Sequence, residues 1–264
     1  MGGKANPASA DSKWVRWLAV LLGMAALDVA AQSVLVPMPP DKDFIASVRS
    51  LALVDIDDPT HFTVMNPLGG VLPLFGAIGG ALAAQSDAAQ RQQIRDEFTA
   101  IMQKQNVEMG KLLTASIVQK LRASGVDVQV LSGARKRKGF PITDLSTTEI
   151  PAGIEALLDI FFVNPYFIAV GNIQDYEPVV SAVVRVHRVK DKKVVYQQMF
   201  QYSKSMKVDG SPFRPILTEY QKGITFSNQK AIYDSPDKAL QGFQQSIEPL
   251  AGRIQVELMS WRKQ

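Results

Sequence analysis

Two long stretches with helical apolar periodicity constrain the fold of this chain more than any other feature. The first runs from Asp87 to Ser124, although Asn106 and Gly110 lower the helix propensity in its middle and leave a break into two helices open. The second runs from Pro236 to Trp261, where Pro249 is expected to introduce a kink. Each stretch has one apolar face that needs a surface to cover. The apolar positions are Ile94, Phe98, Ile101, Met109, Leu112, Ile117 and Leu121 in the first stretch and Leu240, Phe243, Ile247, Leu250, Ile254, Leu258 and Trp261 in the second.

About five apolar segments of strand length supply that surface. The first stops at Asp57-Asp58-Pro59, which is the pattern of a buried strand followed by a turn. The last two alternate and form a β-hairpin, with Ser181, Arg185 and His187 expected on its more exposed face. A short helix is expected over Pro151 to Leu158. The strand segments are Ser50 to Ile56, Val126 to Leu131, Asp159 to Val170, Val179 to Val189 and Val194 to Ser203.

Together these segments predict a protein of the α+β class with a two-layer α/β arrangement. A mixed sheet of about five strands with a C-terminal β-hairpin is covered by one long central helix and a C-terminal helix. We expect a single domain over residues 50–264, with a glycine-rich excursion at residues 63–86. Val208 to Tyr233 lacks a sustained period and is expected to be mostly loop.

The first 31 residues have the layout of a secretory signal peptide. Basic residues precede an uncharged apolar run from Trp17 to Leu27, and Val29-Ala30-Ala31 supplies the small residues that signal peptidase needs. About 11 apolar residues are too few for a membrane span, which needs about 20. The pattern predicts cleavage before Gln32 and a periplasmic or cell-envelope location, with an uncleaved inner-membrane anchor as the weaker alternative. Residues 32–49 contain three prolines and are predicted to form an extended leader.

Two segments are candidates for contact with a partner. Thr63 to Ser86 carries no charge and is rich in glycine, which suits membrane contact or self-association, or else a loop packed over the core. Arg135 to Lys138 places four positive charges side by side, which suits either a solvated loop or a patch that contacts an anionic surface. The interaction candidates are Gly69, Gly70, Gly76, Gly79, Gly80, Arg135, Lys136, Arg137 and Lys138.

The residue inventory excludes most catalytic chemistry. The chain has no cysteine and two histidines, His61 and His187, both expected in surface or loop positions, so we expect no zinc site, no thiol nucleophile and no cofactor. Asp55, Asp57 and Asp58 form an acidic cluster at the end of a strand. They could hold Mg²⁺ or Ca²⁺, but such residues before a proline are more often turn formers. The formal net charge of +4 is too small to predict nucleic-acid binding.

The order of the predicted elements resembles that of small α/β periplasmic lipoproteins. A strand from Leu51 to Ile56, a long helix that ends in Leu121-Arg122-Ala123-Ser124-Gly125, and a hairpin around Arg185 to Asp191 carry the resemblance. It is similar to proteins of the curli-secretion and penicillin-binding-protein-activator type and to the amino-terminal domain of the Tol-system propeller protein. The chain departs from these lipoproteins because it lacks a cysteine for lipid attachment.

The resemblance implies a non-enzymatic accessory role in the cell envelope. Our expectation is an exported protein that binds an envelope protein or a membrane surface, with self-association as a further outcome and no nucleic-acid partner. The alternative is a hydrolase or transferase that acts on an envelope polymer through carboxylates such as Asp55 or Asp57.

Overall fold

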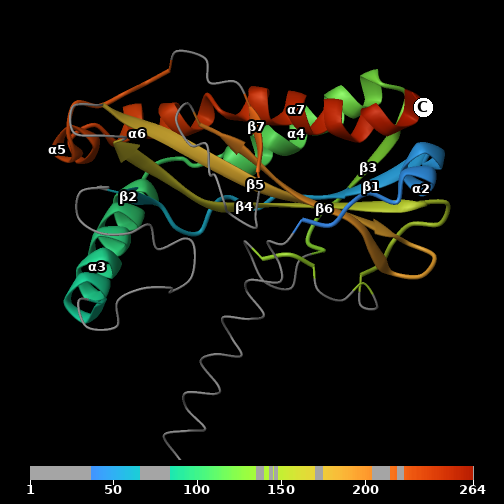
Figure 1. The fold of residues 1–264 in the computed structure, drawn as a ribbon, viewed down its shortest axis with the longest axis horizontal. Coiled ribbons are helices and arrows are strands. Elements are labelled where there is room, and N and C mark those ends of the chain that lie inside the picture. Colours follow the sequence, from blue (N-terminus) through green and yellow to red (C-terminus); the bar gives the residue numbers. More distant parts are fainter. Residues whose placement is uncertain are drawn as a thin grey trace, which may run out of the picture. The chain divides into compact units, whose positions relative to one another are not determined.

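The computed structural model describes residues 37–65, 84–134, 140–142, 145, 148–169, 175–203, 215–218 and 223–263. Within these residues the fold is built around a seven-stranded mixed sheet (Figure 1). The strands are β1 (Ser50–Val54), β2 (Thr63–Met65), β3 (Asp127–Leu131), β4 (Ala156–Ala169), β5 (Tyr176–Arg188), β6 (Lys193–Tyr202) and β7 (Ile216–Thr218). Their order is β3-β1-β4-β5-β6-β7, and β2 pairs with β4.

The sheet combines a parallel part with an antiparallel hairpin. Strand β1 pairs in parallel with β3 and β4, and β7 pairs in parallel with β6. Strands β4, β5 and β6 are antiparallel neighbours, which confirms the predicted hairpin and the mixed α+β class. The expected five strands become seven because β2 and β7 have three residues each, too few to produce a visible alternation in the sequence.

Strands β1 and β2 lie one after the other along the same edge of β4. Leu53 pairs with Leu158, and Thr63 pairs with Tyr166. Between these two pairs the β1–β2 segment advances from residue 53 to 63, and β4 advances from residue 158 to 166. The β1–β2 segment is therefore only two residues longer. The pair β1 and β2 therefore behaves as one strand interrupted by a short detour, and the Asp57-Asp58-Pro59 turn predicted from the sequence lies in that detour.

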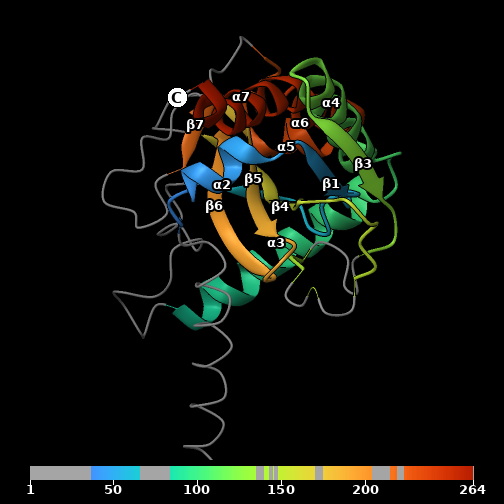
Figure 2. The same ribbon diagram turned by 90° about the vertical axis from the view of Figure 1, so that its right-hand side faces the viewer.

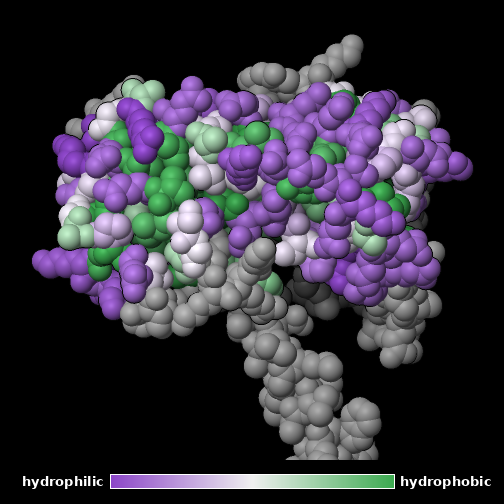
Figure 3. All heavy atoms as spheres, turned by 180° about the vertical axis from the view of Figure 1, so that it is seen from behind, coloured by the Kyte–Doolittle hydropathy of each residue, from purple (hydrophilic) through white to green (hydrophobic). Residues whose placement is uncertain are grey.

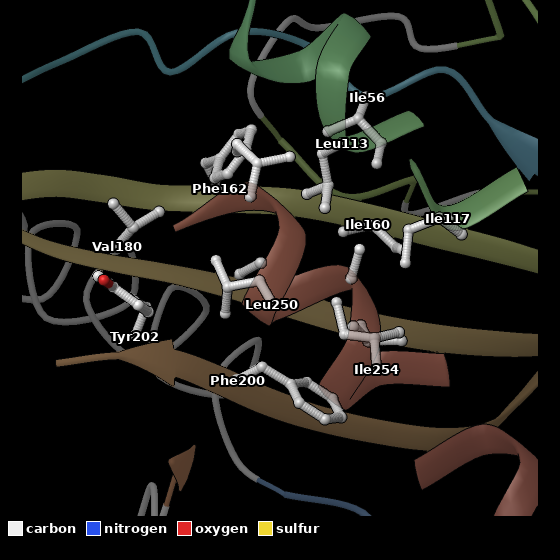
Figure 4. Close-up of a cluster of buried hydrophobic side chains, with 14 of the residues drawn as sticks. Ile56, Leu113, Ile117, Ile160, Phe162, Val180, Phe200, Tyr202, Leu250 and Ile254 are labelled. Carbon is white, nitrogen blue, oxygen red and sulfur yellow. The ribbon is translucent and has the colours of Figure 1, made fainter. Parts of the chain in front are cut away.

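Helices cover one face of the sheet and enclose the main core (Figures 1 and 2). The helices of this layer are α4 (Met109–Ala123), α6 (Pro236–Gln244) and α7 (Ile247–Ser260). Figure 4 shows side chains from α4 and α7 meeting those of β4, β5 and β6. Leu113, Ile117, Leu250 and Ile254 are fully buried in this cluster, which confirms that both helical stretches pack on the sheet.

Each predicted long helix is in fact a pair of helices. The first divides into α3 (Ala84–Met102) and α4, and the break at residues 103–108 includes Asn106, the weak point of the sequence pattern. The second divides into α6 and α7 just before Ile247. Pro249 therefore lies in the first turn of α7, where its missing N–H group costs no intrahelical bond, and the expected kink there was wrong.

Three local predictions need correction. The helix predicted over Pro151 to Leu158 was wrong, because a turn that contains Gly153 at φ +84° leads directly into β4. The leader is not extended throughout, because α2 (Lys42–Ser47) begins where the Asp41 Oδ1 atom accepts a hydrogen bond from the Phe44 amide at 3.2 Å. Leu112 was assigned to the buried face of its helix, but it is 41% exposed, and its neighbour Leu113 is buried instead.

Candidate functional site

A concave site lies between α4 and the outer edge of β3, at the end of β1. Figure 2 shows α4 and β3 side by side. It is a groove with a volume of about 1120 Å³. Because the carboxyl ends of β1 and β3 both face it, its position matches the usual placement of ligand sites in parallel sheets. The groove is lined by Asp55, Ile56, Asp57, Asp58, Pro59, Thr60, Gln103, Lys111, Thr114, Ala115, Val118, Gln119, Arg122, Val130 and Ser132.

The floor of the groove is the detour between β1 and β2, and hydrogen bonds connect it to the first turns of α4. The Asp58 Oδ1 atom accepts a hydrogen bond from the Gly110 amide at 2.8 Å, and the Thr114 Oγ1 atom accepts one from the Ile56 amide at 3.1 Å. A Cβ atom at Gly110 would lie 2.0 Å from the Ile56 carbonyl oxygen, so no larger residue fits without a shift of the backbone. Glycine at this position therefore allows α4 to approach the floor closely.

Asp58 thus has a structural role. Burial raises the pKa of its carboxyl, and the hydrogen bond from the Gly110 amide opposes that rise. The same bond caps the amino-terminal end of α4, where Glu108 makes no side-chain cap of its own. Asp55 also bonds to backbone, because its Oδ2 atom accepts a hydrogen bond from the Gly133 amide at 3.2 Å.

Strand β3 forms one wall and leaves part of its backbone unpaired. The Asp127 amide donates to the Arg49 carbonyl at 3.0 Å, and the Leu131 carbonyl accepts from the Asp55 amide at 3.1 Å. Because alternate residues of a strand direct their backbone groups to opposite sides, Val128 and Val130 direct theirs away from β1. Among the described residues no further strand pairs with β3 on that side.

Helix α4 forms the facing wall, and the two ends of the groove differ in charge. Asp55, Asp57 and Asp58 lie at the end next to the first turns of α4, where Lys111 is paired with Glu108 at 3.2 Å. Arg122 lies at the other end, where its Nη2 atom donates to the Val128 carbonyl at 2.7 Å. Ala115 and Val118 lie between these ends in the sequence of α4 and give the wall an apolar middle. A ligand in this groove therefore meets carboxylates at one end and a guanidinium at the other.

Apolar surface accompanies the groove. Val130 and Leu112 are each 41% exposed, although both are large apolar residues. Seen from behind (Figure 3), apolar side chains gather on the side of the molecule where α4 and β3 lie, whereas the side that carries α3 is mostly hydrophilic. Helix α3 is accordingly rich in polar residues along its length.

The opposite face of the sheet carries a row of polar side chains that the sequence analysis placed at the surface. Ser181 and His187 are buried, so their predicted exposure was wrong. Part of this face is covered by a segment that carries Ile142 and Leu145, which pack over Leu157, the cross-strand partner of His187. Burial, together with the charge of Arg185, lowers the pKa of His187 to about 4.

Asp159 anchors the covering segment to this face. Its carboxylate is fully buried, and its Oδ2 atom accepts a hydrogen bond from the Ile142 amide at 2.8 Å. Arg185 pairs with Asp159 across the strands and donates from Nε to the Gln197 side chain. Asp159 bonds to the backbone and Arg185 bonds to the Gln197 side chain, so we assign these two residues to structure, whereas the buried His187 Nε2 atom has no hydrogen-bond partner among the described residues. The other histidine, His61, lies half-buried in the loop before β2, in agreement with the sequence prediction.

The structure brings together the predicted acidic residues but leaves the other candidates outside its described part. Gly69, Gly70, Gly76, Gly79, Gly80 and the run from Arg135 to Lys138 all fall in segments that are not described. Among the described residues, no group of three or more histidine, cysteine, aspartate or glutamate side chains could hold a metal ion. The magnesium or calcium hypothesis for Asp55, Asp57 and Asp58 therefore gains no support.

The α4 wall was not predicted from the sequence. Its groove-facing residues follow one another at three- and four-residue steps, opposite the buried stripe, which is a signal that could have been found. The helical pattern alone gives no reason to expect the edge of a strand next to these residues. The residues that α4 contributes to the wall are Lys111, Thr114, Ala115, Val118, Gln119 and Arg122.

No helix in the described part of the chain is both long enough and apolar enough to cross a membrane. No family model and no curated protein sequence matches the chain. Three of the solved structures that match the chain show a distant likeness. A Xanthomonas campestris protein of the DUF330 family is 13% identical, with a TM-score of 0.35, over 81% of this chain and 90% of its own.

The other two structures are equally remote. A Helicobacter pylori protein described as a homolog of neuraminyllactose-binding hemagglutinin is 11% identical, with a TM-score of 0.34, over 83% of this chain and 89% of its own. A hypothetical protein from Chlamydia trachomatis is 11% identical, with a TM-score of 0.33, over 81% of this chain and 99% of its own. These similarities are too low to assign a family or a function.

Proposed function

We propose that this chain is an exported, non-enzymatic accessory protein of the cell envelope that binds a protein partner in the groove between α4 and β3. The observation that carries the proposal is the groove itself. It joins an apolar wall, a strand edge with unpaired backbone groups and a fixed floor, and these are features of a surface that receives another chain.

The export part of the proposal rests on the amino-terminal sequence pattern. Amino-terminal sequencing of protein recovered from the envelope should begin at Gln32. Recovery of protein that begins at Met1 would contradict cleavage. The glycine-rich segment and the basic run remain predicted interaction elements, because both lie outside the described residues.

The enzymatic alternative has weaker support. It would use Asp55 or Asp57 as acid or base, yet Asp55 and Asp58 accept hydrogen bonds from the backbone amides of Gly133 and Gly110. Acids fixed in this way hold the floor together. We therefore favour binding over hydrolysis or transfer.

A photoreactive amino acid at position Ala115 tests the binding function in living cells. Ala115 is exposed and lines the groove, so irradiation should yield a covalent adduct with one envelope protein. The matched control carries the same photoreactive group at Val256, which is 53% exposed and is not part of the groove. Adducts at Ala115 but not at Val256 would support the proposal, whereas equal or absent adducts at both positions would contradict it.

A further inference from the structure

We infer that the partner enters the groove as an extended peptide strand that adds to the open edge of β3, a binding mode that rests on the proposed function. The occupant is a segment of another protein with alternating apolar side chains, a basic residue at its amino-terminal end and an acidic residue at its carboxyl-terminal end.

The backbone of β3 supplies the pairing groups. Val130 directs its N–H and C=O groups away from β1, and the N–H of Val128 faces the same way. The C=O of Val128 already accepts from Arg122, which marks the limit of the open edge. An added strand can therefore form a hydrogen-bonded pair with Val130 and extend toward Ser132 at the other end.

Helix α4 supplies the contacts for side chains. Val128 is fully buried on the helix side of the sheet, and Val130, two residues later, has its side chain on the same face but 41% exposed in the groove. In an added strand next to β3, alternate side chains would point to the same side, toward Ala115 and Val118 on the α4 wall. Apolar residues at those positions would cover surface that is now exposed.

The charges at the two ends set the direction. Helix α4 runs opposite to β3, which is why Arg122 meets Val128, whereas Gly110 and Thr114 meet the floor at the end of β1. Antiparallel pairing is the more stable arrangement. It places the amino-terminal end of the added strand next to the floor carboxylates and its carboxyl-terminal end next to Arg122. A basic residue first and an acidic residue last complement both ends.

The test is a titration of the purified protein with a blocked seven-residue peptide of sequence Lys-Thr-Val-Thr-Val-Thr-Glu, in which the lysine, both valines and the glutamate lie on the same face of the strand. The inference expects saturable binding that weakens at least tenfold when lysine and glutamate are exchanged. It expects a similar loss when the peptide amides that face β3 are N-methylated, since methylation removes the pairing donors. Equal binding of the three peptides, or no binding of the first, would overturn it.

Two variants of the protein test the same edge. Val130→Pro removes an outward N–H that no described strand uses, so the fold should persist and binding should fall at least tenfold. Val130→Thr keeps the N–H and the branched shape, so it should lose less binding than Val130→Pro. Should the proline variant fail to fold, the N-methylated peptide decides the question.

The cellular cross-link separates the two proposals. If Ala115 adducts form and Val130→Pro leaves their yield unchanged, strand addition is refuted while the binding function stands. If no adduct forms at Ala115 although the peptide binds in the predicted direction, the binding mode holds for the isolated protein and the cellular function falls.

Discussion

Gly110 offers the sharpest test of how the groove is built. Replacing it by alanine should add about 1 kcal/mol of helix propensity if nothing else changed. The new Cβ, however, would lie 2.0 Å from the Ile56 carbonyl oxygen and 2.8 Å from the backbone carbon of Asp57, so the helix and the floor must separate. Overpacking of this kind costs about 1–3 kcal/mol.

Separation of α4 from the floor also weakens two hydrogen bonds. The Gly110 amide would lose the Asp58 carboxylate, and the Ile56 amide would lose the Thr114 hydroxyl, at about 1 kcal/mol each. Set against the gain in propensity, the net loss in the free energy of unfolding for Gly110→Ala is about 2–4 kcal/mol. Gly252 is the matched control, because it lies within α7 and a Cβ there meets nothing within 4 Å.

Urea denaturation followed by circular dichroism compares the two variants with the parent protein. Gly252→Ala should stabilise the fold by about 0.5–1 kcal/mol, because alanine loses less backbone entropy than glycine. Gly110→Ala should shift the midpoint in the opposite direction. A Gly110→Ala protein at least as stable as its parent would show that α4 does not rest on the floor as described.

Three further predictions concern the core, the helix cap and the polar face. Ile254→Ala should lower the free energy of unfolding by about 2–5 kcal/mol because Ile254 is fully buried, whereas Leu112→Ala should lower it by less than about 1 kcal/mol because Leu112 is exposed. Equal losses in urea denaturation would contradict the assignment of Ile254 to a buried helix face and of Leu112 to an exposed one. Asp58→Ala removes the acceptor for the Gly110 amide and should cost about 1–2 kcal/mol, while Asp58→Asn keeps an acceptor oxygen and should cost less. The lowered pKa of His187, about 4 against the ordinary 6.5, predicts stability that is complete above pH 6.5 and is lost as the pH falls toward 4, by about 3 kcal/mol in total. His187→Gln should flatten that pH dependence, and an unchanged slope in the variant would show that other groups produce it.

The sequence predicted the elements whose pattern is local. The strands that became β1, β3, β5 and β6 show short apolar runs or alternation, and the two helical stretches carry apolar stripes, so local patterns located them. Leu112 and Leu113 are adjacent, and Leu113 lies four residues from both Met109 and Ile117, so the helical spacing favours Leu113 and the assignment of Leu112 to the buried face overlooked it. Periodicity failed for β2 and β7, which are held by neighbours that lie far away in the sequence.

The groove depends on facts that no local pattern contains. In the sequence, Gly110 is a residue that weakens a helix. In the structure, its missing side chain allows the Ile56 carbonyl of another segment to approach α4 closely. The sequence predicts Asp58 to be a turn former. In the structure it lies in the irregular loop between β1 and β2, and its bond to α4 follows only from the tertiary fold. His187 is predicted to be exposed because charged residues flank it in the sequence. It is buried because a segment near Ile142 covers this face of the sheet.

The interruption between β1 and β2 has a consequence for the rate at which a partner binds. Both ends of the groove floor are paired to β4, and its middle is bonded to α4, so the surface is already in place before any partner arrives. Binding to a preorganised surface involves no slow rearrangement of the receptor. We expect single-exponential association that rises linearly with partner concentration, at about 10⁵–10⁷ M⁻¹s⁻¹, and differences in affinity between peptides should appear in their dissociation rates.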